Sequence, residues 1–81
     1  MQVKDKSIAE LGLIIRTDWA RPYFGARPYI TALCQIHSID DYYGNEPATH
    51  VIRYFLANAG QWRGEVARAV KAELKERIGL K

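Results

Sequence analysis

The apolar residues in the last twenty positions of the chain recur at every fourth residue, which is the spacing of one face of an α-helix. They are Trp62, Val66, Val70, Leu74 and Ile78. At about 100° per residue, Arg68, Lys71 and Lys75 fall on one side of this stripe, and the glutamates of the segment fall on the other. The pattern predicts a helix from residue 62 to residue 78 with an apolar, a basic and an acidic face, which Gly79 terminates.

Another helix is predicted to begin at Ser7. The run from Ser7 to Glu10 matches a capping box, in which the serine oxygen accepts from a first-turn amide and the glutamate reaches back to the cap. Pro22 stops this helix, and Gly12 either weakens it or indicates a close crossing with another helix. A short strand through residues 13–15 is the alternative. The apolar face of the helix consists of Ile8, Leu11, Ile15 and Trp19.

The segment over residues 21–29 contains the triplet Arg-Pro-Tyr twice and is predicted to be a structured loop. Pro28 suits the first turn of a helix, and the apolar periodicity extends that helix to about Ile39. Residues 40–46 are then expected to form a loop, with a turn at the Gly-Asn pair of residues 44–45.

The next helix is predicted to begin at Pro47 and to end before a break at residues 58–61. Its apolar residues make a wide arc, so that only Thr49, His50 and Arg53 are expected to face outwards. The arc consists of Ala48, Val51, Ile52, Phe55, Leu56 and Ala59.

Four short helices joined by loops predict an all-α fold with bundle-like or orthogonal packing. The chain has 81 residues, of which 48% are hydrophobic and 26% charged, as in a single soluble globular domain. We therefore expect one helical domain over residues 1–81, with residues 1–6 as a flexible N-terminal tail. A domain this short buries only about 60% of its unfolded surface, so its many aromatic residues favour self-association.

Cysteine content and hydropathy favour a cytoplasmic location. Cys34 is the single cysteine, which excludes a disulfide within the chain, and no basic-then-apolar segment typical of a signal peptide begins it. No apolar run, such as residues 13–15, approaches the roughly 20 residues that span a bilayer. The sequence thus predicts a cytoplasmic protein that does not cross a membrane.

The charge of the chain is unevenly distributed. The formal net charge is +3, and residues 61–81 alone carry +3. The basic character therefore lies on the last helix. It permits an acidic partner without requiring one, because many small proteins carry such a charge for solubility.

One group of residues has the types that bind metals or activate a thiol. Cys34 and His37 are three apart on a predicted helix, and Asp41 and His50 would complete a tetrahedral zinc site. The same pair would serve as nucleophile and base, but no third group is evident to orient the histidine. A lone cysteine more often packs as a small hydrophobe. The sequence therefore predicts no metal, no cofactor and no enzymatic activity.

The loop over residues 21–29 is the best candidate site, because it interleaves two arginines with three aromatic residues. This mixture is enriched at interfaces and also stacks on nucleic-acid bases. The structural alternative is that Tyr23 and Phe24 fill the core. We expect a non-catalytic interaction module that binds another protein or itself, as a homo-oligomer. The predicted anchors are Arg21, Tyr23, Phe24, Arg27, Trp62 and Arg63.

Nucleic-acid binding is the alternative function. The third helix, the break at residues 58–61 and the last helix resemble a helix-turn-helix, which would place the last helix in a major groove. The glutamates of that helix would be repelled by phosphates, and a helical hairpin that closes the core is the simpler interpretation. The residues expected to neutralise phosphates are Arg63, Arg68, Lys71 and Lys75.

Several motifs of this chain resemble those of short uncharacterised proteins encoded in bacterial and phage genomes. They are Tyr23-Phe24-Gly25-Ala26, Pro28-Tyr29, Tyr43-Gly44, Tyr54-Phe55-Leu56-Ala57-Asn58-Ala59 and Trp62-Arg63-Gly64-Glu65. The resemblance covers residues 18–78. It implies a bacterial or phage origin, and it implies no activity.

Overall fold

The computed structural model describes residues 2–80, and four α-helices account for most of them. Met1 and Lys81, the two ends of the predicted domain, lie outside the described residues. The α-helices are α1 (Ile8–Asp18), α2 (Arg27–Leu33), α3 (Ala48–Ala57) and α4 (Glu65–Arg77). Two 3₁₀ turns, η1 (Val3–Asp5) and η2 (Phe24–Ala26), and two short strands, β1 (Tyr42–Tyr43) and β2 (Glu46–Pro47), complete the elements. The predicted mostly helical fold is confirmed.

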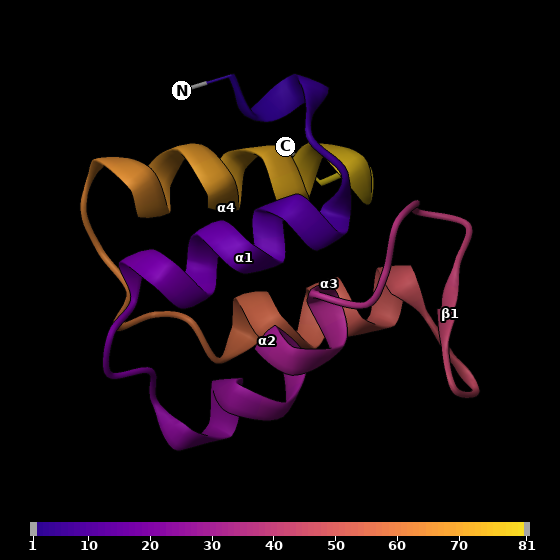
Figure 1. The fold of residues 1–81 in the computed structure, drawn as a ribbon, viewed down its shortest axis with the longest axis horizontal. Helices are drawn as coiled ribbons and strands as arrows, with labels where there is room; N and C mark the ends of the chain where they lie inside the picture. The colour runs from indigo at the N-terminus through magenta and orange to yellow at the C-terminus, as the bar shows by residue number, and fades with distance from the viewer. Residues whose placement is uncertain (1, 81) are drawn as a thin grey trace.

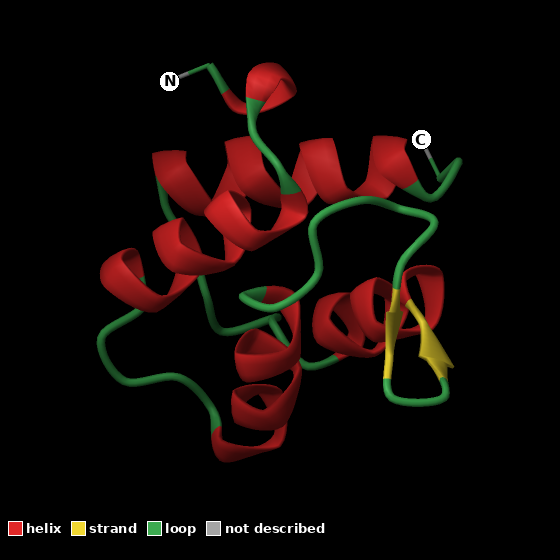
Figure 2. Ribbon diagram, turned by 45° about the vertical axis from the view of Figure 1, so that its right-hand side comes forward, coloured by secondary structure: helices red, strands yellow, loops and turns green. Residues whose placement is uncertain are grey.

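The helices form two pairs that enclose the core. Figure 1 shows α1 and α4 packed side by side in the upper half of the view, running in opposite directions. Below them lie α2 and α3, and the hairpin of β1 and β2 precedes α3 at the right of the same view. Figure 2 shows α2 crossing the other helices steeply, so the packing is orthogonal rather than that of four aligned helices.

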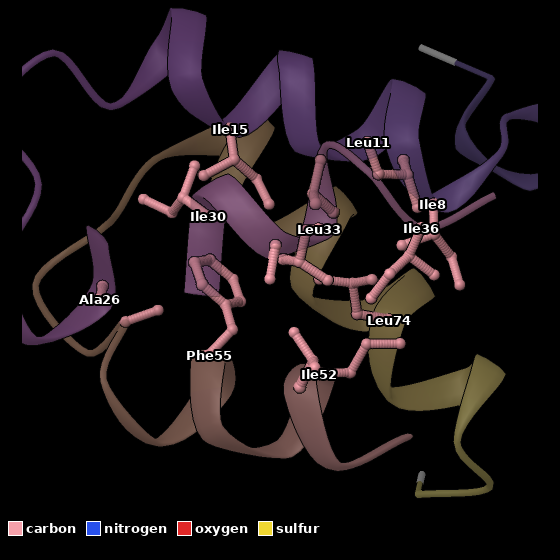
Figure 3. Packing of buried hydrophobic residues seen from close by; sticks show 14 of the residues in the cluster. Ile8, Leu11, Ile15, Ala26, Ile30, Leu33, Ile36, Ile52, Phe55 and Leu74 are labelled. Carbon is pink, nitrogen blue, oxygen red and sulfur yellow. The ribbon is translucent and has the colours of Figure 1, made fainter. Parts of the chain in front are cut away.

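The core is built from the apolar faces of all four helices (Figure 3). Burying one large aliphatic side chain stabilises a fold by roughly 1.5–3 kcal/mol, so this cluster is the main source of stability. None of its members is polar or charged. The largest fully buried side chains are Ile8, Leu11, Ile15, Leu33, Ile36, Ile52, Phe55, Val70 and Leu74.

The predicted capping box at the start of α1 is confirmed. The Ser7 amide donates to Glu10 Oε1 at 2.7 Å, and the Glu10 amide donates to Ser7 Oγ at 3.1 Å. The hydrogen bond from the Ser7 amide holds the pKa of the Glu10 carboxyl below its ordinary value. Residues 13–15 lie within α1, so the alternative of a strand there is wrong.

Gly12 marks a close crossing, one of the two predicted possibilities. A Cβ at Gly12 would lie 2.8 Å from the backbone nitrogen of Cys34 and 3.0 Å from its Cα. Backbone atoms cannot swing aside as a flexible side chain does. Only glycine therefore lets α1 approach the end of α2 this closely.

We expect Gly12→Ala to destabilise the protein by about 1–2 kcal/mol. Overpacking costs about 1–3 kcal/mol, and this outweighs the gain in helix propensity of up to about 1 kcal/mol. Gly60→Ala is the matched control, because a Cβ there meets nothing within 4 Å. Urea denaturation followed by circular dichroism measures both variants, and equal stability of Gly12→Ala and the wild type would contradict the tight crossing.

The prediction that the helix after Pro28 continues to about Ile39 is wrong, because α2 ends at Leu33. The chain turns instead, and the Asp41 carboxylate accepts hydrogen bonds from the amides of His37 at 3.0 Å and Ser38 at 3.1 Å. These bonds hold the pKa of Asp41 below its ordinary value. In a continuing helix the His37 amide would donate to a backbone carbonyl four residues before it. Here it donates to the Asp41 carboxylate, four residues after it.

The segment over residues 40–46, predicted as a loop, contributes to a small hairpin. Tyr42 pairs with Pro47 and Tyr43 with Glu46, and Gly44 adopts a φ of 62° in the turn that was expected there. Each strand is only two residues long, too short for an alternating pattern to reveal it.

The prediction that the last helix begins at Trp62 is wrong. α4 begins at Glu65, because Gly64 before it has a φ of 113°, outside the helical region. The predicted terminator is confirmed: Gly79 has a φ of 81°, and the amide of Leu80 donates to the Lys75 carbonyl at 2.8 Å. These are features of a Schellman motif.

The segment over residues 3–6 is hydrogen-bonded to α4 through one side chain of that helix. The expectation of a flexible tail over residues 1–6 stays a prediction. The Arg77 guanidinium donates to the carbonyls of Val3 and Lys4, each at 3.2 Å, and of Lys6 at 2.7 Å. Arg77 is itself held by Glu73 at 2.6 Å. A contact between residues more than seventy positions apart leaves no local pattern in the sequence.

Candidate functional site

Tyr23 and Phe24, two of the predicted partner-binding residues, lie in the segment that connects α1 to α2, and both rings are exposed. Their rings are 4.9 Å apart, and Phe24 is 75% exposed. The structural alternative, in which both rings fill the core, is therefore wrong. Phenylalanine side chains usually pack in the core, so an exposed fraction this large is unusual. Such a ring indicates a contact surface when other exposed rings lie nearby.

Trp62 does not lie on the surface, so its prediction as an exposed anchor is corrected. Its side chain is only 2% exposed and stacks on Trp19 with ring centres 6.0 Å apart. Its edge meets Phe55 at 6.2 Å, and its Nε1 donates to Asp18 at 2.9 Å. The loop before α4 folds Trp62 inwards, where it joins the core.

The arginines of the predicted site do not gather around the exposed rings. Arg27 lines a groove between α1 and α2 together with Arg16, and no tyrosine or phenylalanine lines that groove. Arg21 is exposed in the loop before η2, and Arg63 lies near Lys71 on the α4 side. The structure therefore divides the six predicted residues among separate places.

A second group of rings lies on α2, α3 and the hairpin. The Tyr29 and Tyr54 rings have centres 5.6 Å apart, and His50 lies 6.3 Å from Tyr54. In Figure 1, α2 and α3 lie below α1 and α4, and the hairpin lies at the right beside α3. The hairpin, α2 and α3 enclose a groove of about 240 Å³, lined by Pro28, Tyr29, Ala32, Tyr43, Glu46, Val51 and Tyr54.

Asn58 at the end of α3 connects the two groups of rings. Its amide donates to the Tyr54 carbonyl at 2.8 Å. Its Oδ1 lies 3.0 Å from the position that a Cβ on Gly25 would take, and the Tyr23 ring lies 2.6 Å from the same position. Asn58 thus brings Tyr23 close to the C-terminal end of α3, one turn after Tyr54. We call the rings of these two groups, taken together, the aromatic face. Its members are Tyr23, Phe24, Tyr29, Tyr43 and Tyr54.

Tyr43 and Tyr54 were missed as candidate residues by the sequence analysis. For Tyr54 a signal existed, because His50, Tyr54 and Asn58 are spaced four apart and follow one side of α3. Tyr43 carried no such signal, since its place beside the groove depends on the hairpin. The wide apolar arc of α3 is confirmed, as are the exposed positions of His50 and Arg53. The prediction that only Thr49, His50 and Arg53 face outwards is wrong, because Tyr54 is 45% exposed and Thr49 is half-buried.

Lys71, one of the four predicted phosphate contacts, is not a freely solvated cation. Its Nζ donates to the carbonyls of Ala59 and Trp62, each at 2.6 Å, and lies 5.9 Å from the centre of the Trp62 ring. Burial lowers the pKa of Lys71, and the nearby charges of Lys75 and Arg63 lower it further. Lys71 is therefore half-buried against the segment that precedes α4.

The connection between α3 and α4 does not have the short turn of a helix-turn-helix. Residues 58–64 separate the two helices, whereas that motif has a turn of about 3–4 residues. Figures 1 and 2 show the two helices running in roughly opposite directions, as in a helical hairpin. Arg63, Arg68 and Lys75, the other three predicted phosphate contacts, are exposed.

Two of the four residues considered for a metal site, Asp41 and Cys34, make other contacts. Within residues 2–80, no three His, Cys, Asp or Glu side chains gather where they would hold a metal ion. Asp41 accepts backbone hydrogen bonds, and Cys34 lies against Gly12.

Within residues 2–80, no helix has both the length and the apolar character needed to cross a membrane.

Comparison with protein-family models, with curated proteins and with solved structures gives no match. The likeness to short bacterial and phage proteins therefore stays a prediction.

Proposed function

We propose that this protein is a non-catalytic, cytoplasmic interaction module that binds another protein surface through its aromatic face, and that its first partner is a second copy of itself. The observation that carries this proposal is the exposure of several rings in the segment before α2, on α3 and on the hairpin, with Phe24 at 75% and Tyr54 at 45%. Tyrosine and other aromatic residues are enriched at the centres of protein interfaces.

The size of the groove in the aromatic face supports a protein partner over a small molecule. The groove measures about 240 Å³, which is below the roughly 300–1,000 Å³ of pockets that enclose small ligands. A space of this size suits one large apolar side chain from a partner. An exposed ring such as Phe24 is a side chain of that kind.

The composition of the surface supports pairing with a second copy. A two-fold interface brings the same patch of each subunit together, so the patch must complement itself. The aromatic face offers tyrosine rings, and Arg53, one position before Tyr54 on α3, is exposed. Guanidinium groups of one copy and rings of the other would form cation–π contacts of about 0.5–1 kcal/mol each at exposed sites.

Light scattering over a concentration series tests this proposal. We expect the wild type to reach about twice its chain mass of 9.3 kDa, because two aromatic faces bury each other. Phe24→Ser and Phe24→Ser with Tyr54→Ser should lower the association, the double variant more strongly. Circular dichroism confirms that each variant is folded.

Leu13→Ser is the matched control, because Leu13 is 53% exposed on α1 and takes no part in the aromatic face. It should associate as the wild type does. A wild type that keeps the mass of one chain at every concentration would overturn the pairing, as would a loss of association in Leu13→Ser but not in Phe24→Ser.

A further inference from the structure

The outer side of α4 carries another surface, which shares no residue with the aromatic face. α1, η1 and α3 contact α4 and leave part of its circumference uncovered (Figure 1). An open groove of about 520 Å³ follows this uncovered side to the end of the helix. It is lined by Arg68, Lys71, Ala72, Lys75, Glu76 and Leu80, and we call it the α4 groove.

The cations of the α4 groove and its surroundings are not neutralised within the protein. Among the residues that the structure describes, no carboxylate lies within ion-pair distance of Arg63, Arg68 or Lys75. Glu73, on the acidic side of the helix, is already paired with Arg77 at 2.6 Å. The groove therefore has a net positive potential that an acidic group from outside would neutralise.

Lys71 fixes one of these charges in place. Two of its three ammonium hydrogens point to the Ala59 and Trp62 carbonyls, at 2.6 Å each, so the side chain has one well-defined position. The third hydrogen remains for another acceptor. A cation that is already ordered loses little conformational entropy when an anion binds beside it.

The groove also has an apolar part, which indicates what kind of anion it suits. Leu80 is 43% exposed at one end, and Ala72 lies between the positions of the cations. Glu76 contributes a negative charge to the same wall. A phosphate backbone has no apolar surface to cover Leu80, whereas an acidic segment with apolar side chains is complementary both to the cations and to the apolar lining.

We propose that the α4 groove binds an acidic, amphipathic segment of a partner protein. Carboxylates of that segment pair with Arg68 and Lys75, and an apolar side chain packs on Leu80 and Ala72. This is the helix-in-groove mode of recognition, in which spaced apolar anchors set the register and charges set the orientation. The surface acts independently of the aromatic face.

Fluorescence anisotropy with the full chain tests the proposal. The probe is a labelled helical peptide with glutamates on one face and leucines on the other; the comparison peptides replace every glutamate by lysine or every leucine by serine. A labelled mixed-sequence DNA duplex is the third comparison. We expect the acidic leucine peptide to bind most tightly of the four and the lysine peptide not to bind.

The variant Arg68→Glu with Lys75→Glu should weaken binding of the acidic peptide by at least about tenfold, since two attractive charges become repulsive. Leu80→Ser should weaken it by a few-fold. Arg16→Glu with Arg27→Glu is the matched control, because it makes the same charge change in the groove between α1 and α2. Lys71 is left unchanged, since it also holds the fold together.

Three outcomes would overturn the proposal. The first is tighter binding of the duplex than of the acidic peptide, with affinity that falls steeply as salt rises, which would identify a phosphate-binding surface. The second is an equal loss in the control variant, which would reveal only a general charge effect. The third is the absence of peptide binding to the folded wild type. None of these outcomes bears on the aromatic face, whose test is the mass of the particle.

Discussion

Trp62→Ala is expected to destabilise the protein by about 3–5 kcal/mol, the usual cost of deleting a buried tryptophan. Trp62 is 2% exposed, stacks on Trp19 and meets the edge of Phe55, so its removal leaves a cavity among aromatic rings. Small domains have a total stability of only about 5–15 kcal/mol, and this one is short. Urea denaturation followed by circular dichroism and tryptophan fluorescence measures the loss.

Two further variants distinguish the contribution of the buried Trp62 ring from that of its hydrogen bond and from the effect of removing any aromatic ring. Trp62→Phe keeps a ring in the core but loses the hydrogen bond to Asp18 at 2.9 Å, so it should cost less, about 1–2 kcal/mol. Tyr42→Ala removes an exposed ring and should change stability by less than about 0.5 kcal/mol. A Trp62→Ala variant with unchanged stability would mean that the ring is not part of the core.

Lys71→Glu is expected to destabilise the protein by about 2–4 kcal/mol, a large effect for a charge change on a helix. The substitution removes the donor of two hydrogen bonds, and the new carboxylate faces the carbonyls of Ala59 and Trp62, which are acceptors as well. Each acceptor left without its partner costs about 1–3 kcal/mol when it is shielded from water. The loop between α3 and α4 should loosen first.

Lys75→Glu makes the same charge change one turn further along α4 and is the matched control. Lys75 is exposed and should tolerate the change within about 0.5 kcal/mol. Thermal unfolding of the two variants, compared at the same pH and salt, measures the difference. Equal melting temperatures for both variants would show that the contacts of Lys71 contribute nothing to stability.

Local signals in the sequence predicted the helices well wherever neighbouring residues decide the structure. The capping box of Ser7 and Glu10 and the terminating Gly79 were both confirmed. In each case the groups that hydrogen-bond are within five residues of one another, so the pattern of residue types is sufficient. The apolar faces of α1, α3 and α4 were predicted for the same reason, because helical geometry converts spacing into a face.

The predictions failed at two helix ends, because the apolar spacing continues beyond the residues at which the helix ends or begins. α2 ends at Leu33 rather than near Ile39, where α1 crosses at Gly12 and Asp41 holds the following turn. Trp62 follows the spacing of the α4 stripe but packs from a loop, because φ at Gly64 interrupts the helix. Spacing alone cannot distinguish a buried residue on a helix from a buried residue just before it.

The sequence by itself determined a single small domain of four amphipathic helices, with a basic side on the last one, since these features follow from composition and periodicity. Only the tertiary structure decided which polar and aromatic side chains remain available to a partner. In the folded protein Trp62 is buried and Lys71 is hydrogen-bonded to two backbone carbonyls, while Phe24 and Tyr54 are exposed. The physical reason is that exposure depends on which faces pack together, and packing joins residues that the chain order keeps apart.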